Sequence, residues 1–135
     1  MYQSILVPLV LDHEHDNAKA LAVAQHLLSD GGTITAIHVM DELPAYVMQH
    51  LHEGQRAQQR ADRVAELAAE VKDIPNVEAH VIVGHAGHTI LEHAEKIGAD
   101  CVIIASHQPG MQDYFLGSTA ARVVRHAKCA VHVIR

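Results

Sequence analysis

Residues 100–135 have the sequence DCVIIASHQPGMQDYFLGSTAARVVRHAKCAVHVIR. The stretch 100–105 is apolar at its centre, which is typical of a strand covered on both faces. A helix is expected over 118–127 and a final strand over 129–134. A strand, a crossover helix and a second strand in this order predict two parallel strands.

The same alternation extends toward the N-terminus. Strands are expected over 4–10, 33–40 and 77–83, and helices over 16–29, 55–72 and 89–97, with a loop or short helix around 45–51. Five strands and four helices in strict alternation predict one α/β domain over 1–135. Its architecture would be an open, doubly wound parallel sheet of the Rossmann-like type, with helices on both faces.

Composition excludes several classes of protein. The net charge of −6, from 10 Lys+Arg and 16 Asp+Glu, repels polyanions, so nucleic acid is not an expected partner. No apolar run approaches the roughly 18 residues of a membrane span, and MYQSILVPLV lacks the features of a signal peptide. Cys101 and Cys129 lie in apolar stretches and are expected to be free thiols. A cytoplasmic protein is expected.

Ligands of doubly wound sheets bind beyond the carboxyl ends of the strands, which directs attention to 8–12, 39–41 and 105–119. Gly117-Ser118-Thr119 opens a helix. Its free backbone amides, positive dipole end and two hydroxyls suit a phosphate group, and glycine permits a close approach. The alternative is that Ser118 only caps the helix.

The chain also resembles a known family over its whole length. The likeness is carried by ILVP at 5–8, IHV at 37–39, ADCVIIASH at 99–107, LGS at 116–118 and VVRHAKCAVHVIR at 123–135. These segments resemble the universal stress protein family, and ASHQP resembles its bacterial F and G subgroup. The resemblance implies the strand order 3-2-1-4-5, a homodimer and, in many members, an ATP site between the first and fourth strands.

Nucleotide-binding members of that family carry the motif Gly-x2-Gly-x9-Gly-Ser/Thr, which this chain matches in part. Ala105 and Gln108 stand at the first two glycines, the next spacer is one residue shorter, and Gly117 and Ser118 match the end. The resemblance implies that Pro8 and Leu9 border the base and Val39 packs on adenine. It further implies that the ribose and phosphates are lined by Ala105, Ser106, His107 and Gln108. The phosphate oxygens would be held by Gly117, Ser118, Thr119 and Ala120.

One departure concerns the first loop. The family usually places an Asp where this chain has Val10, and Asp12 follows two residues later. A charge-assisted hydrogen bond contributes about 1.5–3 kcal/mol, so its loss would weaken nucleotide binding about 10- to 150-fold.

The sequence therefore predicts a stress-response regulatory protein that binds ATP or another adenine nucleotide, with or without Mg²⁺. Binding would control dimer assembly or the affinity for a client protein. The alternatives are an interaction module of the same fold that binds no nucleotide, and a flavin domain, which the low aromatic content disfavours. No catalytic motif is present, so at most slow, incidental ATP hydrolysis is expected. The apolar final strand, Cys129–Arg135, would be a sheet edge, which favours a homodimer or a dimer of dimers.

Thirteen histidines are unusual for this length. His88 and His93 are five residues apart rather than four, and no other pair has the spacing of a zinc motif, so no metal site is expected. Protonation of several of the thirteen histidines below pH 6.5 would shift the net charge from −6 toward zero.

Overall fold

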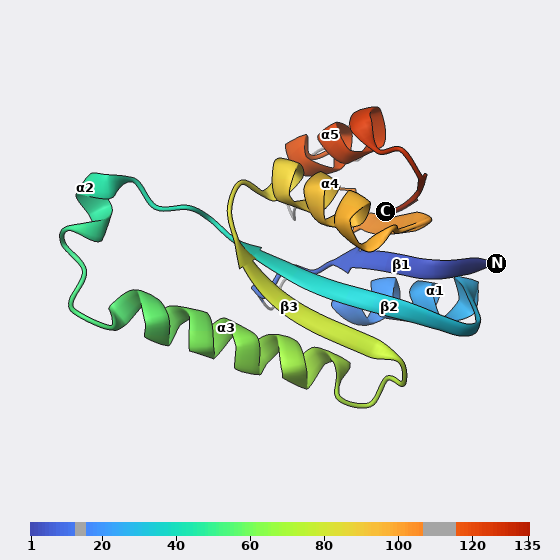
Figure 1. Cartoon of the computed structure of the whole chain (residues 1–135), viewed down its shortest axis with the longest axis horizontal. Helices are drawn as coiled ribbons and strands as arrows, with labels where there is room; N and C mark the ends of the chain where they lie inside the picture. Colours follow the sequence, from blue (N-terminus) through green and yellow to red (C-terminus); the bar gives the residue numbers. More distant parts are fainter. Residues whose placement is uncertain (13–15, 107–115) are drawn as a thin grey trace.

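The computed structural model describes residues 1–12, 16–106 and 116–135. These residues form five parallel strands and five helices, with the strand order β3-β2-β1-β4-β5 (Figure 1). The doubly wound α/β fold and its strand order are therefore confirmed. The elements are β1 (Tyr2–Pro8), α1 (Asn17–Leu27), β2 (Leu28–Met40), α2 (Ala45–Met48), α3 (Gln55–Val71), β3 (Val77–Val83), α4 (Ala86–Ile97), β4 (Cys101–Ala105), α5 (Ser118–His126) and β5 (Ala130–Ile134).

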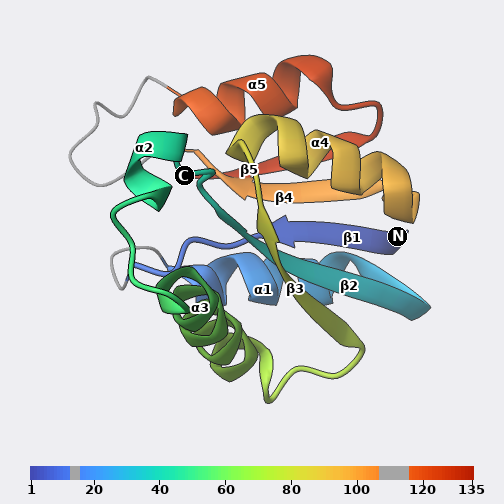
Figure 2. The same cartoon turned by 60° about the vertical axis from the view of Figure 1, so that its left-hand side comes forward.

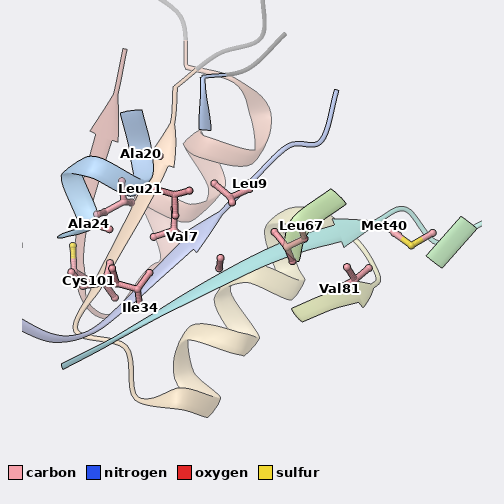
Figure 3. Close-up of a cluster of buried hydrophobic side chains, with 13 residues drawn as sticks. Val7, Leu9, Ala20, Leu21, Ala24, Ile34, Met40, Leu67, Val81 and Cys101 are labelled. Atoms are coloured by element: carbon pink, nitrogen blue, oxygen red, sulfur yellow. The ribbon is translucent and has the colours of Figure 1, made fainter. Parts of the chain in front are cut away.

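Alternating side chains of the central strands build two hydrophobic layers. Figure 3 shows the first layer, in which Val7, Ile34 and Cys101 pack with Leu21 of α1 and Leu67 of α3. The intervening strand residues point to the other face, where they meet α4 and α5. Accordingly, α1 and α3 cover one face of the sheet, and α4 and α5 cover the other (Figure 2).

The position of the site follows from β1, which lies between β2 and β4. Ile5 pairs with Ile34 on one side and with Cys101 on the other. The chain winds outward in opposite directions from β1 and from β4, so the loops that follow these two strands diverge. A crevice at this end of the sheet is the expected ligand position.

Several element boundaries differ from the predicted ones. The first helix ends at Leu27 rather than near Gly31, and β2 begins at once with Leu28, whose ψ of 131° is already extended. The β1–β2 register then shifts, and Gly31 adopts a φ of +79° within this irregular part of β2. Either Asp12 or Asp16 could cap this helix on the sequence alone, and the cap is Asp16, whose carboxylate accepts the Lys19 N–H at 3.1 Å.

Helix α4 begins at Ala86 rather than at 89, and the uncertain segment near 45–51 contains the short helix α2. Gly98 ends α4 with a φ of +66°, a left-handed conformation that glycine adopts readily at the end of a helix.

The orientation of α3 was predicted only in part. Its apolar face was expected to consist of Ala57, Ala61, Val64, Leu67, Ala68 and Val71. Leu67 is buried and Val71 packs against the core, as expected, but Val64 is 48% exposed. The N-terminal half of α3 extends past the carboxyl ends of β2 and β3 (Figure 1). Polar side chains of this half border the crevice instead.

Candidate functional site

A cleft of about 850 Å³ lies at the carboxyl ends of the strands. Ten of the residues predicted from the sequence line it together: Pro8, Leu9, Val10, Val39, Ala105, Ser106, Gly117, Ser118, Thr119 and Ala120. The other two, His107 and Gln108, lie outside the described residues. Met40 and Asp41, from the expected segment 39–41, also line it. Sequence reasoning missed four further lining residues, His38 of β2 and Arg56, Gln59 and Arg63 of α3.

The loop after β1 is held by backbone and side-chain hydrogen bonds. The Leu9 N–H donates to the Ile37 carbonyl at 2.8 Å, and the Leu9 carbonyl oxygen lies 3.0 Å from His38 Nδ1. Since a carbonyl only accepts, Nδ1 carries the hydrogen in this contact. Asn17 Nδ2 donates to the Val10 carbonyl at 2.8 Å. Leu9 is thereby buried, whereas the apolar side chain of Val10 is 41% exposed.

The opposite wall is the start of α5. Gly117 occupies the N-cap position and offers no side-chain cap, so the interpretation of Ser118 as the cap is wrong. Ser118 is the first helical residue. The Gly117 carbonyl accepts the Ala121 N–H at 2.8 Å, which closes the first turn. The amides of this turn have no side-chain acceptor from the cap residue, and they are the donors that a helix offers to an anion.

Backbone hydrogen bonds connect this wall to the last strand. The Gly117 N–H donates to the Ser106 carbonyl at 2.5 Å, and the Ser106 N–H donates to the Ile134 carbonyl at 2.8 Å. Ser106 is buried, with 1% of its surface exposed. The start of α5 is therefore fixed relative to β4 and β5.

Helix α3 supplies a basic wall. Arg56 donates from Nη2 to the Asp41 carbonyl at 2.5 Å and from Nη1 to Gln59 Oε1 at 3.1 Å. Arg63 Nη2 lies 2.5 Å from Glu66 Oε1. The two arginines are seven residues apart, which places them on one helix face, and this spacing was the signal available in the sequence.

A second cavity of about 450 Å³ adjoins the cleft and shares Ser118 and Thr119 with it. It lies between the start of α4 and the outer face of α5. The basic side chains that line this second cavity are His85, Arg122, Arg125 and His126. Arg122 lies here against Gly87.

The charge of these two cavities is opposite to that of the whole protein. Among the described residues, four of the ten Lys and Arg side chains line the cavities, namely Arg56, Arg63, Arg122 and Arg125. Of the fourteen described Asp and Glu, which leave out Glu14 and Asp113 of the sixteen in the chain, only Asp41 does. Such a local concentration of one sign attracts a ligand of the other sign. The arrangement is suited to hold an anion.

The cysteines and histidines outside the cavities show no comparable arrangement. Burial, with smaller contributions from Cys129 and Asp100, raises the pKa of Cys101 to about 11, so this thiol is protonated at neutral pH. Within the part of the chain that the structure describes, no three His, Cys, Asp or Glu side chains are grouped to hold a metal ion. In the same part, no helix has the length and apolarity needed to cross a membrane.

The whole chain, residues 1–135, matches the model of the universal stress protein family. Universal stress protein G of Shigella flexneri is 31% identical over the full length of both chains. The solved universal stress protein UspA from Lactobacillus plantarum is 26% identical, with a TM-score of 0.71 over 99% of this chain and 98% of its own. A universal stress protein solved in complex with cAMP has the same fold, with 18% identity and a TM-score of 0.68 over 99% of this chain and 97% of its own. On the family match and the full-length identity, the chain belongs to the universal stress protein family.

Proposed function

We propose that the protein is a stress-response regulator that binds ATP or another adenine nucleotide in the cleft. The observation that carries this proposal is the basic lining of the two adjoining cavities in a chain of net charge −6. Such a lining favours a phosphorylated ligand. The start of α5, which has no side-chain cap, offers backbone N–H groups that can donate hydrogen bonds to phosphate oxygens.

The rest of the ligand has an apolar surface available to it. Val10, which is 41% exposed, and Val39, which is partly exposed, line the cleft together with the buried Leu9 and Met40. A flat purine gains by covering such side chains, while its phosphates extend toward Ser118 and Thr119. The solved relative in complex with cAMP supports an adenine nucleotide as the ligand of this fold.

Mg²⁺ would enter with the phosphates of the nucleotide. Asp41 supplies the one carboxylate among the described residues of the lining. Magnesium is commonly held by one or two carboxylates together with substrate phosphates and water, and this donor set fits that mode.

Regulation through assembly is the second part of the proposal. β5 is an edge strand of the sheet, and an unpaired edge can add a strand from a second copy of the chain. The Gly117–Ser106–Ile134 hydrogen bonds give the site a short backbone connection to this edge. A homodimer, or a dimer of dimers, would then change its stability or its affinity for a client protein when the cleft is filled. Free thiols and a nucleotide ligand both suit the cytoplasm.

The test begins with the nucleotide carried by the purified protein. The protein is denatured, its supernatant is analysed by ion-exchange chromatography, and nucleotide-free protein is titrated with ATP by calorimetry. Bound adenine nucleotide, or micromolar affinity for ATP, is the expected result. The absence of both, up to millimolar ATP, would overturn nucleotide binding and favour the interaction module. Val10, which stands in place of a carboxylate, is consistent with that alternative.

Two matched variants locate the site. Ser118→Glu puts a negative charge at the first residue of α5, where it competes with phosphate, so binding should be lost while the helix stays stable. Gln55→Glu makes the same change of charge at the first residue of α3, outside the cleft lining, and should bind ATP as the wild type does. Equal binding by both variants would contradict the proposed site.

A further inference from the structure

The basic side chains of the two cavities come from opposite faces of the sheet. Arg56 and Arg63 belong to α3, and Arg122 and Arg125 belong to α5, whose start is the proposed phosphate site. Figure 2 shows α3 and α5 on opposite faces of the sheet. A single phosphate group at the start of α5 leaves the arginines of α3 without a ligand contact.

Arg56 is placed by neutral groups. Its described partners are the Asp41 backbone carbonyl and the side-chain amide of Gln59, neither of which carries a charge. A guanidinium has five N–H donors, and these two bonds use two of them. The bonds hold Arg56 at the cleft without neutralising it, so its charge and remaining donors are available to an anion.

Arg63 has an unsatisfied donor. Its Nη2 is paired with Glu66 at 2.5 Å, but its Nε is buried and has no hydrogen-bond acceptor among the described residues. A buried N–H without an acceptor is costly in a folded protein. Arg63 itself lines the cleft, so a movement of its side chain toward an anion there would give the guanidinium a new acceptor.

We infer that the ligand of this chain is a nucleoside bisphosphate, with one phosphate at the start of α5 and a second phosphate, carried by the ribose, at Arg56 and Arg63. The inference rests on the proposed function. A second phosphate can be attached to the first, as in ADP and ATP, or to a sugar hydroxyl. The first kind lengthens the phosphate chain at the start of α5, so an anion held by the arginines of α3 is assigned to the ribose. An arginine beside the ribose is the device with which dinucleotide-binding folds accept a sugar phosphate, where a carboxylate would bind the free hydroxyl. At the rim of this cleft Val10 provides no carboxylate that would repel such a group.

The test compares AMP, ATP, adenosine 3′,5′-bisphosphate and adenosine 2′,5′-bisphosphate by calorimetry at one ionic strength. At least one of the bisphosphates should bind the wild type about 10-fold more tightly than AMP, the gain expected from one charge-assisted hydrogen bond. Arg56→Gln and Arg63→Gln should each weaken bisphosphate binding more than AMP binding, and so remove most of this advantage.

Arg60→Gln is the matched control. Arg60 lies on α3 between the two arginines, but it donates to the Val81 carbonyl and does not line the cleft, so the bisphosphate advantage should persist. Equal binding of AMP and both bisphosphates by the wild type would overturn the inference and leave the proposed function standing. Loss of the advantage in Arg122→Gln, but not in the α3 variants, would also overturn it. If no adenine nucleotide binds, the inference and the proposed function both fail.

Discussion

The side chain of Arg122 lies directly against Gly87, so closely that a methyl group on Gly87 would come within 2.6 Å of Arg122 Cδ. Gly87 is buried in the first turn of α4, and Arg122 belongs to α5. The missing side chain therefore makes room for an arginine to cross between the two helices beside the second cavity.

We expect Gly87→Ala to weaken ligand binding without lowering the stability of the fold. Alanine favours a helix over glycine by about 0.5–1 kcal/mol, and the atom it displaces is far out on a flexible side chain, so the free energy of unfolding should not fall. The affinity for ATP should drop about 2- to 5-fold, because the exposed guanidinium of Arg122 must move. Urea denaturation and calorimetry measure the two effects. In an Arg122→Gln background the alanine should cause no further loss of affinity, and an equal loss there would contradict this explanation.

Asp100 anchors the start of β1. Its two carboxylate oxygens accept the N–H groups of Gln3 at 2.9 Å and of Ser4 at 3.0 Å. Asp100→Ala should lower the free energy of unfolding by about 1.5–3 kcal/mol, measured by urea denaturation, because hydrogen bonds to a charged group are lost. Asp62→Ala removes an exposed carboxylate bonded to Gln58 and should change stability by less than about 0.5 kcal/mol. A similar effect of both substitutions would show that Asp100 has no special anchoring role.

The sequence predicted the sheet better than it predicted the walls of the cleft. Continuous apolar runs at 4–10 and 100–105 fixed two central strands, because strands covered on both faces need such runs. Gly117-Ser118 likewise identified the start of α5. In contrast, the periodicity of α3 predicted an apolar face that includes the buried Leu67, but it could not show that half of this helix extends beyond the strands and brings Arg56 and Arg63 to the cleft. Periodicity identifies the faces of a helix but not what lies opposite each one.

The close approach of Arg122 to Gly87 could not have been predicted for a related reason. Gly87 and Arg122 are distant in sequence, and their contact depends on how tightly α4 and α5 pack. A helix start expected at 89 also left Gly87 in a turn, where a glycine is unremarkable.

His93 should make the protein less stable in mild acid. Burial, the nearby charge of His80 and then that of Lys96 lower the pKa of His93 below its ordinary value of 6.5. The unfolded chain therefore takes up a proton more readily, so the stabilising contribution of neutral His93 is complete above pH 6.5 and is lost as the pH falls below it. His93→Gln should reduce the slope of unfolding free energy between pH 6.5 and 5. His88→Gln, at an exposed residue beside Glu92, should not flatten that slope, and an equal flattening would point to surface charge instead.

Cys101 should resist alkylation in the folded protein. Burial, with Cys129 and Asp100 as smaller causes, raises its pKa to about 11, and only the thiolate reacts. Iodoacetamide should label Cys101 slowly at pH 8 and rapidly after unfolding, as followed by mass spectrometry of the peptide. The raised pKa also means that stability is complete below pH 9 and is lost as the pH rises toward 11. Rapid labelling of the native protein at pH 8 would contradict the buried, protonated thiol.

The edge strand β5 gives the proposed dimer its most direct test. Ala130 begins this strand and is exposed, and within the described chain β5 pairs only with β4. A lysine on an edge strand opposes pairing with a second chain, because the charge would have to be desolvated in the new interface. Ala130→Lys should therefore convert a wild-type dimer to a monomer in sedimentation velocity. Ala57→Lys makes the same change at an exposed position of α3 and should remain dimeric. A monomeric wild type, or a dimer that both variants retain, would exclude β5 as the interface.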